Sequence, residues 1–256
     1  MAGLRTLQLS GDLESLLNEL PPIQSLIYLR LVSTQHRKTI GIDLMLAALE
    51  RQSTIVRLQL DDINICNGLR PPRSPTESES EGWDAEGEVD VPVSAGSHGN
   101  VGLEALSCFG IEIDEAALGK VLSKLVRLKV LTIERASDGD LIDIEFSGGF
   151  HVPTKHLSAA LAQAAASLEQ LSFVPIFDIY ESIEDISLFE SLRHFSSLRD
   201  LVIYPELLIG RMSCPNWIIV TEPQPCHVLA TKLPSSLETL TLAINLVQAD
   251  RRGVAY

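Results

Sequence analysis

Cysteine and histidine side chains are the first candidates for chemistry in this sequence. Cys214, Cys226 and His227 lie near one another in the segment CPNWIIVTEPQPCH, but their spacing matches no closed zinc pattern. His151 and His156 lie beside a glycine pair in GGFHVPTKH, without a cysteine partner or a phosphate-binding turn. We therefore expect no metal site, and we interpret all five residues as loop residues.

Catalytic motifs do not point to an enzyme either. The sequence contains no G-x-S-x-G, P-loop, G-x-G-x-x-G or H-E-x-x-H pattern, and its carboxylates are scattered over predicted surfaces. We expect a non-enzymatic protein without a cofactor. Two alternatives stay open: a hydrolase or transferase with a site in the segments 136–153 and 211–226, which would need convergent titratable groups there, or a truncated paralogue without retained function.

The charge of the chain is acidic, with a formal net charge of −14 over 256 residues. Nucleic acid and negatively charged membrane surfaces would repel such a chain, so neither is an expected partner. No apolar run reaches membrane-spanning length, and the N-terminal MAGLRTLQLS lacks the apolar region of a signal peptide. The four cysteines show no disulfide framework, which indicates reduced thiols and a cytoplasmic or nuclear protein.

A short apolar pattern recurs along the whole chain. The template L-x-x-L-x-φ, in which φ is apolar, begins at Leu4, Leu26, Leu103, Leu128, Leu168, Leu198 and Leu237, and a variant begins at Ile55. Five of these strand patterns follow an apolar stripe at helical spacing, which predicts helices near 12–20, 41–51, 114–126, 155–166 and 185–195. Helix and strand patterns alternate as units, and the shorter spacings match a leucine-rich repeat of about 20–29 residues.

These observations predict the fold class and its divisions. We expect a right-handed α/β leucine-rich-repeat solenoid of about eight irregular repeats, with a parallel concave sheet and convex helices. Residues 1–69 and 101–256 form the two parts of one continuous solenoid. Between them, residues 70–100 are acidic, rich in Ser, Gly and Pro, and contain no leucine, which predicts a disordered insert.

The repeat phrases resemble a known family. SLIYLRL, SLEQLSF, FSSLRDLVIYPELLIG and LPSSLETLTL are similar to the repeat region of irregular F-box/leucine-rich-repeat proteins of fungi. That resemblance implies substrate recognition for a cullin-type ubiquitin ligase. The N-terminal F-box of the family is absent from this sequence, so contact with a Skp-type adaptor requires an F-box supplied elsewhere.

Candidate binding residues come from the alternation of the strands. In x-L-x-L-x the leucines point into the solenoid and the x residues line the concave sheet. The x residues of the types that anchor protein interfaces are Tyr28, Arg30, Arg57, Phe109 and Tyr204. We expect a protein partner on this face, and the negative charge of the chain favours a basic one.

The acidic insert has a second interpretation. SPTESESE places Ser74, Thr76, Ser78 and Ser80 among prolines and acids, a context that acid-directed or proline-directed kinases use. Phosphorylation would deepen the negative charge. A plain solubilising insert explains the same composition equally well.

Overall fold

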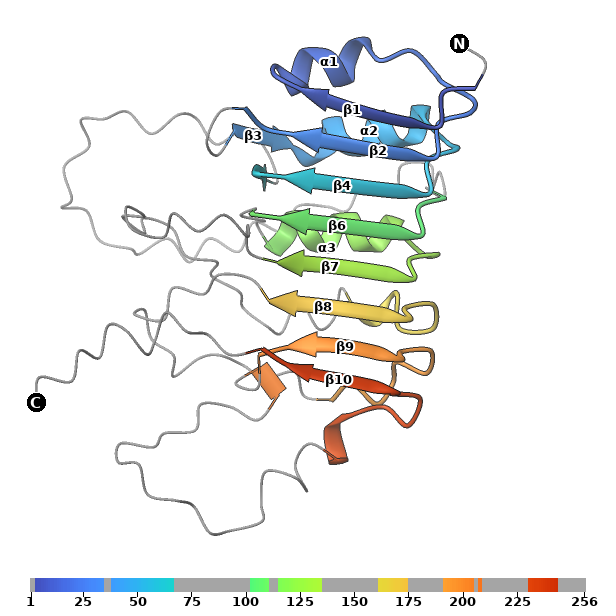
Figure 1. The fold of residues 1–256 in the computed structure, drawn as a ribbon, viewed down its shortest axis with the longest axis vertical. Coiled ribbons are helices and arrows are strands. Elements are labelled where there is room, and N and C mark those ends of the chain that lie inside the picture. The colour runs from blue at the N-terminus through green and yellow to red at the C-terminus, as the bar shows by residue number, and fades with distance from the viewer. Residues whose placement is uncertain are drawn as a thin grey trace, which may run out of the picture.

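An eight-stranded parallel sheet forms the framework of the protein. The computed structural model describes residues 3–34, 38–66, 102–110, 115–134, 161–174, 191–204, 207–208 and 230–243. The strand order is β1-β2-β4-β6-β7-β8-β9-β10, and every neighbouring pair is parallel (Figure 1). The strands are β1 Thr6–Ser10, β2 Tyr28–Val32, β4 Arg57–Asp61, β6 Ala105–Phe109, β7 Val130–Glu134, β8 Gln170–Val174, β9 Asp200–Ile203 and β10 Thr239–Leu242. All eight predicted strand segments are thus confirmed as parallel strands of one sheet.

The strands align without any offset, so equivalent residues of successive repeats lie side by side. Leu131 of β7, for example, is the partner of Leu106 on β6 and of Leu171 on β8. Two rows of apolar side chains result, and they are buried in the six inner strands. The first row is Leu7, Leu29, Leu58, Leu106, Leu131, Leu171, Leu201 and Leu240, and the second is Leu9, Leu31, Leu60, Cys108, Ile133, Phe173, Ile203 and Leu242.

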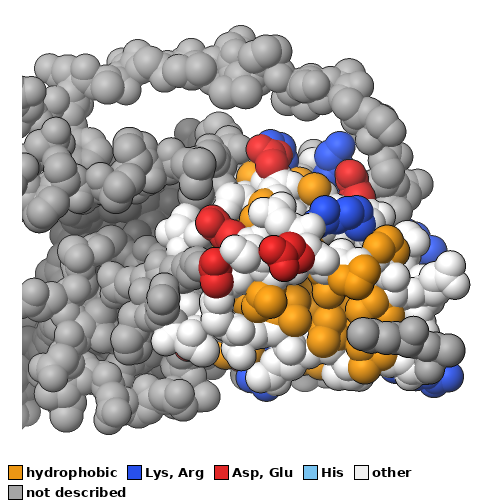
Figure 2. Space-filling model, turned by 90° about the horizontal axis from the view of Figure 1, so that it is seen from above, with side chains coloured by type: hydrophobic (Ala, Val, Ile, Leu, Met, Phe, Trp, Pro, Cys, Tyr) orange, Lys and Arg blue, Asp and Glu red, His pale blue; other side chains and the backbone are white. Residues whose placement is uncertain are grey.

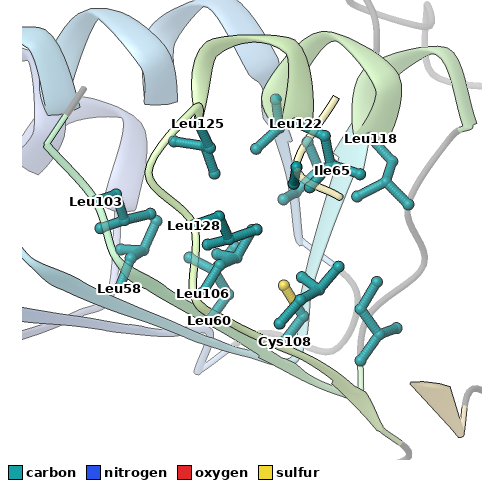
Figure 3. Packing of buried hydrophobic residues seen from close by; sticks show 14 of the residues in the cluster. Leu58, Leu60, Ile65, Leu103, Leu106, Cys108, Leu118, Leu122, Leu125 and Leu128 are labelled. Atoms are coloured by element: carbon teal, nitrogen blue, oxygen red, sulfur yellow. The ribbon is translucent and has the colours of Figure 1, made fainter. Parts of the chain in front are cut away.

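Three helices cover the face of the sheet from which these rows project (Figures 1 and 3). They are α1 Leu13–Glu19, α2 Ile42–Arg51 and α3 Glu115–Lys124, close to three of the predicted spans. In α2 the apolar stripe of Ile42, Met45 and Leu49 is buried, as its helical spacing requires. The span 155–166 is described only from residue 161, with helix at 161–162. Of the span 185–195, the described residues 191–195 contain a turn at 193–194 and no helix, so the predicted helix is wrong over these five residues.

A second, two-stranded parallel sheet was not predicted. Its strands are β3 Lys38–Gly41 and β5 Ile63–Cys66, which follow β2 and β4 in the chain. Ile40, Ile63 and Ile65 are buried in the same core as the leucine rows, and Ile65 lies between the sheet and α3 (Figure 3). KTIG of β3 and INIC of β5 contain no leucine, so the repeat template does not mark them as strands.

Side chains also link one repeat to the next. Buried Gln52 accepts a hydrogen bond from the Ile23 amide (2.9 Å) and donates one to the Pro21 carbonyl (2.7 Å). Ser25 and Ser236 each come directly before the first leucine of a repeat. Their hydroxyls donate to a backbone carbonyl of the preceding repeat, at 2.8 Å in both cases. These bonds satisfy polar groups of turns that pack against the core.

Burial of the leucine rows decreases at the two terminal strands. Leu240 and Leu242 of β10 are 36% and 41% exposed, and Leu7 and Leu9 of β1 are only partly buried. Figure 2 views the molecule from the β1 end and shows hydrophobic side chains gathered there. Within the described residues, β1 and β10 each pair with a single neighbouring strand. Each repeat is therefore buried by its neighbours, which makes the architecture a solenoid-like α/β fold. Residues 70–100 lie outside the described residues, and so the division of the chain stays a prediction.

We expect Leu131→Ala to lower the free energy of unfolding by about 2–5 kcal/mol, because the substitution leaves a cavity between Leu106 and Leu171. Its neighbour Thr132 lies on the opposite face of the same strand, and Thr132→Ala should cost less than about 0.5 kcal/mol. Urea unfolding followed by circular dichroism measures both values. Equal losses for the two variants would contradict the assignment of inward and outward positions.

We expect Gln52→Leu to lower the free energy of unfolding by about 1–3 kcal/mol. The substitution removes the side chain to which both the Ile23 amide and the Pro21 carbonyl are hydrogen-bonded. The exposed Gln24 of the same loop provides the matched control, and Gln24→Leu should leave the urea midpoint almost unchanged. If the two variants unfold at the same urea concentration, the buried glutamine does not hold this turn.

Candidate functional site: the open face of the sheet

The face of the sheet opposite the helices carries the outward side chains of all eight strands, and we call it the open face. It comprises the first, third and fifth residues of each five-residue strand and the first and third residues of β9 and β10. Buried and less buried residues alternate along the inner strands, which assigns these positions to the outside. Its central row is Gln8, Arg30, Gln59, Ser107, Thr132, Ser172, Val202 and Thr241.

A hydrogen-bonded network occupies the N-terminal part of the open face. Arg30 Nε donates to Asp61 Oδ2 at 2.5 Å, and Arg30 Nη1 lies 3.4 Å from Gln8 Oε1. Gln59 Nε2 donates to Asp61 Oδ1 at 3.0 Å and its Oε1 accepts from the Tyr28 hydroxyl at 2.6 Å. The side chains of three strands thus hold one another in fixed positions. The hydrogen bond to Asp61 raises the pKa of the Arg30 guanidinium.

The two arginines of this region differ in whether their guanidinium is already paired with a carboxylate. Arg30 is committed to Asp61, whose side chain is only 13% exposed. Arg57 is exposed, lies beside Tyr28 and Ala105 in the register, and has no ion-pair or hydrogen-bond partner for its guanidinium in the described part of the chain. An arginine side chain without an internal acceptor can pair with a carboxylate or phosphate of a ligand through two parallel hydrogen bonds.

The C-terminal part of the open face carries carboxylates instead. Glu134 of β7 accepts a hydrogen bond from the Ser172 hydroxyl at 2.6 Å, and Asp200 of β9 accepts one from Gln170 Nε2 at 3.0 Å. Among the described residues, no Lys or Arg lies within ion-pair distance of either carboxylate. Their negative charge is therefore available to a cation from outside.

One row of charged residues lies where the strands begin. Lys129 Nζ is 3.0 Å and Arg127 Nη2 is 3.3 Å from the two carboxylate oxygens of Glu104. The hydrogen bond from Lys129 is the main cause of a lowered pKa of Glu104. These charges are satisfied by one another and by solvent, so they compete weakly for a ligand.

Of the five predicted binding residues, four lie on the open face. Tyr28, Arg30 and Phe109 are half-buried outward residues of β2 and β6, and Arg57 is exposed. The expectation that Tyr204 lines this face is wrong, because Tyr204 is only 8% exposed. Tyr204 follows directly after Ile203, the last residue of β9.

Several other predicted features lie outside the described residues. They are the phosphorylation candidates Ser74, Thr76, Ser78 and Ser80, and the segments 136–153 and 211–226 with their histidines and cysteines. In the part of the chain that is described, no three His, Cys, Asp or Glu side chains come together as metal ligands. The described helices include none long and apolar enough to cross a membrane.

Cys108 is a buried member of the second apolar row, as its inward position predicts. Burial raises the pKa of its thiol well above the usual range, with a smaller contribution from the charge of Asp61. The thiol is consequently a packing group and an unreactive one in the folded state.

The alternation of the strands also places Asp61 and Glu134 among the outward residues, but neither belonged to the predicted binding set. Asp61 fixes Arg30, and Glu134 provides an uncompensated carboxylate. Aligning YLRLV of β2 with RLQLD of β4 by their leucines would have placed an aspartate diagonally across from Arg30.

Comparisons with known proteins give little further guidance. The sequence matches no protein-family model and no curated protein. Among solved structures it is similar to an internalin from Listeria monocytogenes, at 13% identity and a TM-score of 0.30, over 92% of this chain and 58% of that chain. This chain thus spans less than two thirds of the internalin structure. A likeness this distant adds nothing to what the strand topology establishes.

Arg30→Ala should lower the urea midpoint of unfolding more than Arg57→Ala does, because the first variant leaves the poorly exposed Asp61 carboxylate without its cation. Arg57 has no partner to lose among the described residues. Both variants remove one positive charge, so they are matched in their effect on net charge. Identical midpoints would contradict the difference between the two arginines.

Proposed function

We propose that this protein is a non-enzymatic scaffold that binds a protein partner on the open face. The observation that supports this is the unbroken register of eight parallel strands, which joins outward side chains from all eight repeats into one continuous surface. The helices pack on the other face, so this surface is free of described helices (Figure 1). Solenoids with such an extended sheet commonly use it for binding.

Tyr28, Arg30, Arg57 and Phe109 are the proposed anchors on this surface. Aromatic and arginine side chains contribute disproportionately to binding energy at protein interfaces. The network around Asp61 holds Tyr28 and Arg30 in place before binding, which reduces the entropy lost on association. In the described part of the chain Arg57 has no partner to give up, so it can contribute its guanidinium directly.

The charge of the protein favours a partner with a positive surface. A net charge of −14 attracts cations over distances of about the Debye length, roughly 8 Å at physiological ionic strength. Association should therefore slow as salt is added. Phosphorylation at Ser74, Thr76, Ser78 or Ser80 would increase this attraction, if the acidic insert is used in that way.

A finer form of the proposal is substrate recognition of the F-box ubiquitin-ligase type, in the cytoplasm or nucleus. It rests on the resemblance of phrases such as LPSSLETLTL to that family. It also requires an F-box supplied elsewhere for contact with a Skp-type adaptor. Basic intracellular proteins would then be the substrates.

The test compares three forms of the protein by affinity purification and mass spectrometry. Wild type and the control Glu50→Ala/Gln163→Ala, whose changes are exposed on the helix-covered side, should retain the same specific partner. Arg57→Ala/Ser107→Arg, which removes a cation and places a bulky side chain in the open face, should lose it. Calorimetry with the purified partner at low and moderate salt then measures the affinities. A partner lost by the control and kept by the open-face variant would place binding on the other side.

A further inference from the structure

The uncompensated charges of the open face are separated by sign. Arg57 lies on β4, toward the N-terminal end, and its guanidinium has no partner among the described residues. Glu134 lies on β7 and Asp200 on β9, toward the C-terminal end. Arg30 adds little to the positive end because Asp61 neutralises it at 2.5 Å. The face thus presents a positive position and a negative region to the same ligand.

A strip of small side chains lies between these charges. We call Ala105, Ser107, Val130 and Thr132 the small-residue strip; they are the first and third residues of β6 and β7. Ser107 and Thr132 are direct partners in the register. Neither hydroxyl has a hydrogen-bond partner within the described residues. Short side chains allow a peptide backbone to approach the sheet closely, and free hydroxyls can bond to its amides and carbonyls.

Simple strand geometry gives the distance between the two charges. Arg57 and Glu134 are separated by two strand spacings of about 4.8 Å, because β6 alone lies between β4 and β7. Along the strands they are four positions apart, since Glu134 is level with Asp61, and each position adds about 3.3 Å. The diagonal between their Cα atoms is then roughly 16 Å, which an extended peptide spans in about five residues.

We infer that the open face binds an extended peptide segment of mixed charge. A carboxylate of the segment pairs with Arg57, a lysine or arginine about five residues away pairs with Glu134, and the backbone between them crosses the small-residue strip. The inference rests on the proposed function and adds the chemistry of the partner to it.

Each end of the path has the side chain that such recognition needs. The Arg57 guanidinium presents five donors in a planar fork that matches a carboxylate. Glu134 is half-buried and held by the Ser172 hydroxyl at 2.6 Å, so its orientation is fixed before a cation arrives. An all-basic segment would satisfy Glu134 and Asp200 and would place a like charge against Arg57. Complementarity therefore requires both signs in one segment.

A random twelve-residue peptide library displayed on phage tests this inference on the whole chain. Selection is carried out against wild type, Arg57→Gln, Glu134→Gln, the blocked variant Ser107→Arg, and the control Arg5→Gln/Glu50→Gln. The control changes the same residue types at exposed positions away from the open face. Circular dichroism and the urea midpoint verify that each variant is folded before selection.

Wild type and control should enrich peptides in which an acidic and a basic residue are about five positions apart. Selection on Arg57→Gln should lose the acidic preference alone, and selection on Glu134→Gln the basic preference alone. For one synthetic wild-type-selected peptide, each protein change should weaken binding by about twofold to fivefold, as for a single exposed ion pair. Neutralising the matching residue of the peptide should then cost nothing more.

Other results overturn the inference. The selected peptides could show no charge pattern and still fail to bind Ser107→Arg. That result would support the open face as a binding surface and contradict the mixed-charge ligand. Peptides that tolerate Ser107→Arg would also count against the proposed function. A library that yields no enriched sequence on folded wild type would show that the face does not recognise an extended segment.

Discussion

The parallel backbone ladder, aligned without offset through eight strands, is the interaction on which the rest of this structure depends. Because side chains alternate with period two, the alignment stacks leucine on leucine on one face and outward residues on the other. A slip of one residue in any strand would turn its leucines to the outside and its polar residues into the core. Burial of the two apolar rows therefore fixes the register, and the register fixes the composition of the open face.

Polar groups reinforce this arrangement at positions where the core cannot. Gln52 satisfies a turn of the preceding repeat from within the core, and Arg51 donates to the carbonyl of Leu17 at the end of α1. On the open face, Asp61 accepts hydrogen bonds from Arg30 of the neighbouring strand β2 and from Gln59 of its own strand β4. Except for the bond between Gln59 and Asp61, each of these bonds joins residues roughly one repeat apart in the chain. Stability and preorganisation of the face thus come from contacts between neighbouring repeats, as expected for a structure in which each repeat contacts mainly its neighbours.

The sequence predicted the framework well because leucines at fixed spacing carry a strong signal, and all eight strands are where that spacing places them. It failed where tertiary context decides. The strands β3 and β5 contain no leucine and so lack the repeat template, and the described residues 191–195 are not helical despite an apolar stripe. Tyr204 follows the alternation in the sequence, but it lies one position after the end of β9 and is buried. The difference between Arg30 and Arg57 depends on a diagonal partner in the next strand, which no pattern within one repeat reveals.

The central claim is that alternate side chains of each strand point into the core and onto the open face. Thiol accessibility along β7 tests it most directly. Cysteine is introduced singly at each of positions 130–134, and alkylation of the folded protein is followed by peptide mass mapping. Native Cys108, buried on the neighbouring strand β6, provides the internal reference for a protected thiol. The account predicts rapid labelling at positions 130, 132 and 134, and labelling as slow as that of Cys108 at positions 131 and 133. Uniform labelling, or the opposite alternation in variants that remain folded, would contradict it.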